Sequence, residues 1–375
     1  FLLSSAFCFS QHWTPNTDRA LYERAMAEVA WIEPFSKFLE LEKTTIKTPS
    51  PRYYQARWAF IKDVYHDNPQ VSHPNKALDK FILFCTENNL LGTQKEEFIK
   101  AAKILGFELI TDKVAFEAPS GTYKEHLKTE YVYHNGYPQN LDLFVPNTAI
   151  TAPVPCIIFI HGGAWSGHKR AWFEGFARYT ASKGYAAATI DYRLLHAIDS
   201  PLECVYDAKA AVRWIRANAK RYHIDPNKIG VAGASAGGHL AAMLATTADE
   251  ADLEGGIGNL HVSSEVQAAV GLATPALTGK RFSWPWMKGE KPKWFDTISP
   301  YRYISEGDAP MKFIHGTEDN TVAPDDAKDL YEAYTKKGLF TELELVQGKG
   351  HVFYMNQETA EKVLDFMKRV FEDGN

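Results

Sequence analysis

The 375-residue sequence is poor in cysteine, has no excess of positive charge and lacks closely spaced histidine pairs. Its four cysteines form no CxxC pair, which argues against both a disulfide framework and a zinc site. The net charge of −5 gives no support for nucleic acid or an anionic membrane as partner. No two of the 13 histidines have the spacing of a metal-binding pair. We therefore expect no catalytic metal, no cofactor and no nucleic-acid partner.

Long hydrophobic runs are also missing, since no stretch approaches the 18 apolar residues that a membrane-spanning helix needs. The first residues, 1–11, are apolar and end in small and polar side chains. This pattern is typical of the end of a secretory signal peptide, with cleavage near Ser10 or Gln11. A disordered hydrophobic tail is the alternative interpretation. We expect a soluble mature protein that is secreted or periplasmic.

The remaining chain divides into two regions of different pattern. Residues 12–118 place apolar side chains at helical spacing and contain no motif with catalytic spacing, so they predict a helical N-terminal region. Residues 119–375 alternate short apolar runs with amphipathic stretches, among them an expected strand over 130–134 and an expected helix over 203–222. The run 154–160 is continuously apolar, as in parallel strands that are buried on both faces. This alternation predicts an α/β domain with a doubly wound, mostly parallel sheet.

One stretch of that domain, 228–240, has the pattern of a strand, a sharp turn and a helix of small residues. Its turn reads Gly233-Ala-Ser235-Ala-Gly237 and fits G-x-S-x-G, the nucleophile elbow. The glycines on both sides of Ser235 are needed because larger side chains would collide with the strand and the helix. An ordinary glycine-rich turn remains the alternative for the motif alone. Together with the features below, it predicts that Ser235 is a nucleophile.

A serine nucleophile requires a histidine base, which in such a sheet follows the serine in the chain. His239 lies one helical turn beyond Ser235 and cannot easily turn back, and His315 ends a predicted strand. His351 lies in Gly348-Lys-Gly-His351, a loop after the last apolar strand. By position and by elimination, His351 is the predicted base.

The acid that orients the base is expected one strand earlier. The strand Phe313-Ile-His-Gly ends in a turn that carries Glu318 and Asp319 side by side. Asp319 is the preferred residue because its shorter side chain suits a fixed hydrogen bond to an imidazole. Glu318 is the alternative, and a solvated acidic loop would give either residue a purely structural role.

Backbone donors for a developing oxyanion are expected from His161-Gly-Gly-Ala-Trp165, directly after the apolar run 154–160. We assign the oxyanion hole to the N–H groups of Gly163, Ala164 and Ala236, with Gly162 as an alternative. An ordinary turn, with His161 as a buried hydrogen-bonding residue, would explain the same glycines without catalysis.

Aromatic residues are concentrated near the predicted site. The segment 275–300 interrupts the strand–helix alternation, and a connection of this length is typical of lids and binding loops. A loop with a small hydrophobic core of its own is an equal alternative. The tryptophans that we predict to contact substrate are Trp165, Trp284, Trp286 and Trp294.

These motifs, with Asp191-Tyr-Arg193 and His315-Gly-Thr-Glu-Asp319, resemble the α/β-hydrolase superfamily over residues 125–370. Within it, the sequence is similar to the feruloyl-esterase-like and acetylxylan-esterase-like branch, near the hormone-sensitive-lipase type. The resemblance implies a Ser235–Asp319–His351 triad in an exported carboxylesterase that acts on acylated polysaccharides. Two features depart from that pattern: Ala164 stands where many relatives have a third glycine, and the region before residue 115 has no counterpart.

The predicted function is a serine carboxylesterase that hydrolyses a small-molecule or polysaccharide ester, such as an acetyl or feruloyl ester, through an acyl-enzyme. Two other classes stay open. A peptidase or amidase could use the same triad, and a catalytically silent binding protein could share the fold. The acyl group, the alcohol and the oligomeric state are not encoded in a recognisable motif.

Overall fold

The computed structural model of the chain divides into two compact units, Phe1–Lys113 and Val114–Asn375. The second unit is described at 116, 118–119, 121–134, 136–147, 152–195, 197–198, 200–277 and 294–373. In the first unit only eleven positions are described, namely 38–39, 42–43, 45, 57, 85, 94, 97–98 and 100. The predicted signal peptide at 1–11 lies outside the described residues. So does most of the predicted helical region at 12–118, which stays a prediction.

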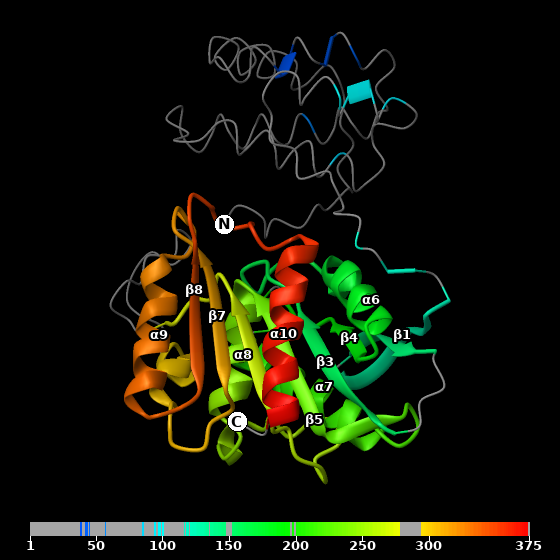
Figure 1. Ribbon diagram of the computed structural model, residues 1–375, viewed down its shortest axis with the longest axis vertical. Coiled ribbons are helices and arrows are strands. Elements are labelled where there is room, and N and C mark those ends of the chain that lie inside the picture. Colours follow the sequence, from blue (N-terminus) through cyan, green and yellow to red (C-terminus); the bar gives the residue numbers. More distant parts are fainter. Residues whose placement is uncertain are drawn as a thin grey trace. The chain divides into compact units, whose positions relative to one another are not determined.

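The second unit is built from strands and helices in alternation (Figure 1). Its eight strands are β1 (Tyr123–His134), β2 (Tyr137–Pro146), β3 (Val154–Ile160), β4 (Ala186–Ile190), β5 (Ile224–Ala234), β6 (Ala268–Leu272), β7 (Met311–Gly316) and β8 (Thr341–Val346). Its α-helices are α6 (Glu174–Ser182), α7 (Leu202–Ala217), α8 (Ala236–Thr246), α9 (Pro324–Lys336) and α10 (Gln357–Asp373). Four short 3₁₀ helices complete the described elements: η2 (Arg170–Phe173), η3 (Ala251–Leu253), η4 (Asp296–Ile298) and η5 (Pro300–Arg302).

All eight strands form one sheet in the order β1-β2-β4-β3-β5-β6-β7-β8. The strands from β4 to β8 in this order are parallel, whereas β2 pairs antiparallel with both β1 and β4. The α/β fold with a mostly parallel sheet is therefore confirmed. Because the parallel strands run in the same direction, the loops after β3, β5, β7 and β8 gather at one edge, the carboxyl edge of the sheet.

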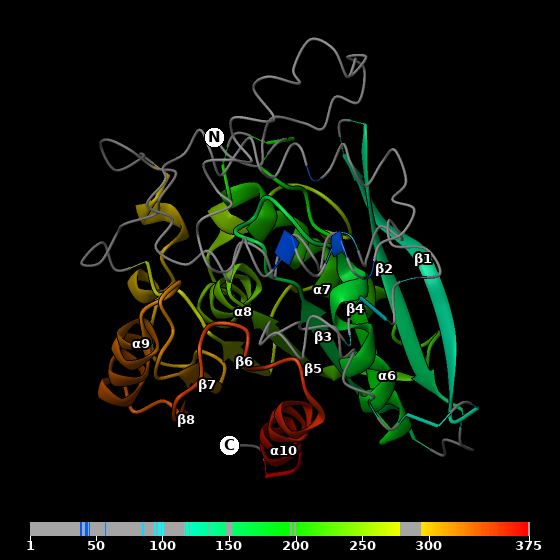
Figure 2. The same ribbon diagram turned by 90° about the horizontal axis from the view of Figure 1, so that it is seen from above.

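Helices cover both faces of the sheet. Figure 2 shows α6 and α10 on one side and α7 and α8 on the other. Side chains of β3 alternate between the two sides: Ile158 belongs to the core cluster with α7, α8 and α9, and Phe159 to the cluster with α6 and α10. This double burial explains why 154–160 is apolar without alternation.

The boundaries differ from the sequence pattern in two places. The pattern predicts a strand over 130–134, whereas β1 begins at Tyr123. The pattern misses the first residues because they lie in an edge strand, where exposed side chains make the sequence polar. The pattern also predicts a helix over 203–222, but α7 ends at Ala217, where the Asn218 side chain donates a 2.9 Å hydrogen bond to the Trp214 carbonyl. Within the described residues, no helix is long and apolar enough to cross a membrane.

Candidate active site

The turn between β5 and α8 holds Ser235 in a strained backbone conformation. Its φ is 54° and its ψ is −119°, a region that non-glycine residues seldom adopt. A Cβ at Gly233 would collide with the carbonyl of Gly237, and one at Gly237 with the carbonyl of Ile160. The Ser235 N–H is held by a 2.8 Å hydrogen bond to Leu272 O in β6. The two glycines of the motif are thus required by contact, and the turn presents Ser235 at the carboxyl edge.

Three side chains predicted to act together meet at this edge. Ser235 Oγ lies 3.0 Å from Nε2 of His351, and Nδ1 of the same imidazole lies 2.7 Å from Asp319 Oδ2. His351 reaches the serine from the loop after β8, and Asp319 from the loop after β7. The structure therefore arranges serine, imidazole and carboxylate in one hydrogen-bonded chain, the order that a proton transfer from the serine requires.

Asp319 is enclosed by donors on both of its oxygens. Oδ1 accepts the N–H groups of Thr321 at 2.8 Å and Val322 at 2.9 Å. Oδ2 accepts from His351 and also lies 3.1 Å from Nε2 of the fully buried His315. Burial alone would raise the pKa of Asp319, but the hydrogen bonds from His315 and His351 outweigh it and hold the pKa well below its usual range. The carboxylate is therefore ionised and fixed in orientation.

His315 was not predicted to belong to the site. Its Nε2 also lies 3.0 Å from the Val322 carbonyl, so this nitrogen faces two acceptors and must carry the proton. A histidine at the end of a mostly apolar strand, just before the acidic loop, was the available signal, but only the fold shows that it contacts Asp319. Glu318, the alternative acid, forms no side-chain hydrogen bond or ion pair among the described residues.

The loop after β3 passes directly beside the nucleophile. A Cβ at Gly162 would come 3.2 Å from Ser235 Cβ and 2.8 Å from the Ala234 carbonyl, so only glycine allows this approach. Gly163 has a φ of 102°, and Ala164 continues the left-handed conformation at 53°. Ala236 begins α8, where the first N–H groups of a helix point outward without helical partners. The N–H groups assigned to the oxyanion hole thus come from segments that border Ser235, and their role stays a prediction.

Neighbouring side chains hold the carbonyls of this loop. The Tyr192 hydroxyl donates to the His161 carbonyl at 3.0 Å or to the Gly162 carbonyl at 3.2 Å. The rings of Tyr192 and His161 stack with their centroids 4.3 Å apart. The Nδ1–H of His161 donates to Gly162 O at 2.8 Å. Burial lowers the pKa of His161 to about 4, so the ring is neutral at physiological pH. Tyr192 comes from the Asp191-Tyr-Arg193 motif, whose contact with the loop depends on the fold.

The predicted aromatic contacts have different outcomes. Trp165 is only 2% exposed, belongs to the hydrophobic core and packs edge-on against His239 at 5.0 Å. Its predicted contact with substrate stays a prediction. Trp294 is half-buried and packs against the same core cluster. Trp284 and Trp286 lie outside the described residues.

Other polar residues near the motifs have structural partners. His239 is buried and its Nε2 lies 2.6 Å from the Ile298 carbonyl, away from Ser235. Asp207, fully buried, receives a bidentate contact from Arg193, with N···O distances of 2.9 Å. Arg213 pairs with Glu254. In the part of the chain that the structure describes, no cluster of His, Cys, Asp and Glu could hold a metal ion.

With this geometry in view, the chain was compared with known proteins. The model of the BD-FAE family matches residues 141–334, more than half of the 375 residues. The chain belongs to the BD-FAE family. The match includes Ser235, Asp319 and the loop after β3, and it confirms the resemblance to α/β-hydrolase esterases.

Curated proteins of similar sequence bear esterase names. Esterase LipC of Mycobacterium tuberculosis is 30% identical over 217 residues, which cover 54% of this chain and 53% of LipC. Isoprenylcysteine alpha-carbonyl methylesterase ICME of Arabidopsis thaliana is 26% identical over 247 residues, 61% of this chain and 57% of ICME. The chain thus spans about half the length of the curated relatives it matches.

Solved structures of similar fold cover about two thirds of this chain. A truncated carbohydrate esterase from gut microbiota superposes with a TM-score of 0.59 at 27% identity, covering 67% of this chain and 98% of that chain. Apo esterase 2 of Thermogutta terrifontis gives a TM-score of 0.58 at 30% identity, covering 68% of this chain and 96% of that chain. The same esterase 2 has also been solved with propionate bound and after phosphorylation by paraoxon.

Proposed function

We propose that this protein is a carboxylic ester hydrolase that cleaves esters through an acyl-enzyme on Ser235. The observation that carries the proposal is the hydrogen-bonded chain from Ser235 Oγ through His351 to Asp319 Oδ2, at 3.0 and 2.7 Å. Membership of the BD-FAE family and the esterase names of the relatives support it.

The reaction follows from the contacts of these residues. His351 Nε2 takes the hydroxyl proton of Ser235 while Oγ bonds to the ester carbonyl carbon, and the carbonyl electron pair moves to its oxygen. The N–H groups of Gly163, Ala164 and Ala236 stabilise that oxyanion, with Gly162 as the alternative donor. On collapse the ester C–O bond breaks, and His351 protonates the departing alcohol. Water then repeats these steps on the acyl-enzyme and releases the acid.

Ionised Asp319 supports each proton transfer. Its Oδ2 accepts the Nδ1–H of His351, so the imidazole keeps the tautomer whose Nε2 is free to accept the serine proton. Its negative charge also stabilises the imidazolium that forms next. Because His315, Thr321 and Val322 hold the carboxylate, it does not have to reorganise during the reaction.

For the substrate we propose an acylated carbohydrate that carries acetyl or feruloyl groups. The structural similarity to a carbohydrate esterase from gut microbiota supports this class, and the propionate bound to a related esterase supports a short acyl group. We further propose that the protein is secreted or periplasmic, on the basis of the signal-peptide-like pattern of residues 1–11.

The first test is hydrolysis of para-nitrophenyl acetate by the wild type and by Ser235→Ala. Loss of the nucleophile should lower kcat/KM by a factor of about 10³ or more. The matched control is Ser182→Ala at the end of α6, whose hydroxyl only binds the Tyr179 carbonyl and which should retain activity. Paraoxon should add a phosphoryl mass to the wild type and not to Ser235→Ala.

The same preparation separates the alternative functions. If the wild type neither hydrolyses esters nor reacts with paraoxon, the esterase proposal fails and a binding protein of the same fold takes its place. Cleavage of a peptide anilide faster than the ester would favour the amidase. Release of acetate from acetylated xylan, compared with release of ferulate from methyl ferulate, then identifies the acyl group.

A further inference from the structure

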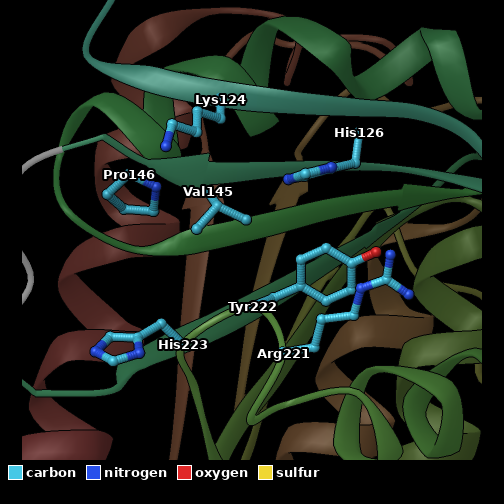
Figure 3. A pocket seen from close by; sticks show the side chains of 7 residues that line it. All are labelled: Lys124, His126, Val145, Pro146, Arg221, Tyr222 and His223. Carbon is cyan, nitrogen blue, oxygen red and sulfur yellow. The ribbon is translucent and has the colours of Figure 1, made fainter.

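A basic pocket lies on the α/β unit away from the Ser235 site. Its volume is about 490 Å³, and four of its lining side chains are Lys124, His126, Arg221 and His223. Figure 3 shows the lining of the pocket, with the amino end of Lys124 on the side of Val145 and Pro146 and the guanidinium of Arg221 beside the Tyr222 ring. We refer to this site as the basic pocket.

The basic pocket is at the opposite edge of the sheet from the catalytic residues. His223 directly precedes β5, and its carbonyl accepts the N–H of Val154 at the start of β3. Lys124 pairs with Val145 near the end of β2, which runs antiparallel to β4. The pocket therefore borders the amino ends of the parallel strands, whereas Ser235 follows the carboxyl end of β5. A ligand bound here cannot touch Ser235.

The cations of this pocket lack acidic partners. Among the described residues, no acidic side chain lines the pocket or forms an ion pair with Lys124 or Arg221. The acids adjacent in sequence are engaged elsewhere: Glu125 pairs with Arg178, and Asp225 Oδ1 accepts the N–H of Asn227. In a chain of net charge −5, this is a local concentration of uncompensated positive charge.

Aromatic contacts hold two of the basic side chains, Arg221 and His126, in place. The Arg221 guanidinium lies 5.3 Å from the centroid of the Tyr222 ring, and the His126 ring meets the same ring edge-on at 4.9 Å. Tyr222 is buried and packs against Trp214, so it forms a fixed floor. Stacking on an aromatic face leaves the N–H edge of a guanidinium available to a ligand.

The state of His126 reports the field in the pocket. Burial lowers its pKa, and the positive charges of Arg221 and Lys124 lower it further. Arg221 and Lys124 therefore lie close enough to act on the imidazole of His126. A bound anion would offset this repulsion and gain charge-assisted hydrogen bonds from Lys124 and Arg221.

We propose that the basic pocket binds an acidic sugar through its carboxylate or sulfate group. The oxyanion would contact the exposed guanidinium of Arg221, with Lys124 adding positive charge to the lining of the same pocket. The volume of about 490 Å³ is several times that of an isolated sulfate, and Val145 and Pro146 provide apolar contact for a ring. The anion is inferred from the charges alone, whereas the choice of a sugar rests on the proposed function.

Binding to the full chain can be measured by isothermal titration calorimetry. The probes are glucuronate and glucose 6-sulfate, with glucose as the uncharged counterpart and inorganic sulfate as the anion without a sugar. We expect both acidic sugars to bind, glucose not to bind, and the acidic sugars to bind at least about tenfold more tightly than inorganic sulfate. The affinity should fall as salt is raised, because partly exposed charges are screened.

A matched pair of variants locates the site. Arg221→Gln removes a cation from the pocket, and Lys220→Gln removes the neighbouring exposed cation that does not line it. Loss of one charge-assisted contact should weaken binding about tenfold in Arg221→Gln. Lys220→Gln should stay within about twofold of the wild type. Arg221→Lys keeps the charge and should retain most of the affinity, which guards against an effect of misfolding.

Three results would overturn the proposal. Glucose could bind as tightly as the acidic sugars, neither acidic sugar could bind, or Arg221→Gln and Lys220→Gln could weaken binding equally. Binding of inorganic sulfate as tight as that of the acidic sugars would remove the sugar from the proposal. Because calorimetry does not depend on turnover, these outcomes are independent of whether Ser235 hydrolyses esters.

Discussion

Charged side chains are paired at the carboxyl edge of the sheet, whereas cations at the amino edge lack acidic partners among the described residues. At the carboxyl edge, Asp319 accepts four hydrogen bonds, and Arg193 is paired with the buried Asp207. At the amino edge, Lys124 and Arg221 face a pocket without an acidic partner. A fully paired charge is held in one geometry before any substrate arrives, whereas an unpaired charge is available to a ligand. The comparison separates residues that organise a reaction from residues that await a binding partner.

Changing the acid, Asp319, should cause the largest loss of activity at the carboxyl edge. In Asp319→Asn, an amide NH₂ can face His351 Nδ1 and favour the tautomer that cannot accept the serine proton. We expect kcat to fall about 10⁴-fold, as for the equivalent change in other serine hydrolases, while the fold is retained. Steady-state kinetics on para-nitrophenyl acetate measure this, and Glu318→Gln is the control. A larger loss in the Glu318 variant would exchange the roles of the two acids.

Removing a paired cation should be the largest change in stability. Arg193→Met leaves the Asp207 carboxylate buried without its guanidinium, and we expect the free energy of unfolding to fall by about 3–5 kcal/mol. Urea unfolding followed by circular dichroism provides the value. The double variant Arg193→Met/Asp207→Leu should recover part of the loss, because no charge is then left buried. Failure to recover any of it would assign the loss to packing.

Two buried histidines near the active site make stability depend on pH. Burial lowers the pKa of His161 and of His239 to about 4, against an ordinary value of 6.5. Between these values the unfolded chain binds more protons than the folded one, so stability is complete above pH 6.5 and is lost as the pH falls toward 4. From pH 7 to pH 5 each ring should cost about 2 kcal/mol. Urea unfolding of wild type and His239→Gln at both pH values checks this, and the variant should lose less on acidification.

The catalytic residues could be predicted from the sequence, but the residues that hold them in place could not, and the reason is physical. The glycines around Ser235 and in the loop after β3 reflect local steric limits, so they are visible in the chain itself. The order of strands then indicates which loops share an edge. By contrast, the contacts of His315 with Asp319 and of Tyr192 with the loop after β3 join residues through tertiary packing.

A strand at the edge of the sheet was harder to predict, because its exposed side chains give it a polar sequence. The first half of β1 is polar because it lies on the edge strand, so it lacks the apolar alternation of a half-buried strand. Trp165 illustrates the converse case: it lies in a loop beside the active site, yet its indole is buried and packs against His239. Sequence patterns report burial only on average, whereas each of these residues depends on its neighbours.

His315 tests whether the partners of Asp319 matter for catalysis. His315→Leu removes one donor from Oδ2, and we expect kcat to fall about 10- to 100-fold with KM nearly unchanged, because the carboxylate is then less firmly oriented. His315→Gln can retain an N–H donor and should fall less. Equal losses in the two variants, or a rise in KM without a change in kcat, would limit His315 to a structural role. Stopped assays at several ester concentrations separate kcat from KM.

The smallest effect is expected at Arg221, a cation without an acidic partner among the described residues. Arg221→Gln loses one cation–π contact, worth about 0.5–1 kcal/mol, but also relieves repulsion between Arg221 and Lys124, which line the same pocket. These contributions oppose each other, so the free energy of unfolding should change by less than about 0.5 kcal/mol, in contrast to Arg193→Met. Urea unfolding at low and high salt measures the balance, since salt screens the repulsion and should leave Arg221→Gln the less stable of the two proteins. A loss above about 2 kcal/mol at either salt concentration would mean that Arg221 is a structural residue like Arg193, and the contrast between the two edges would fail at the residue on which it depends most.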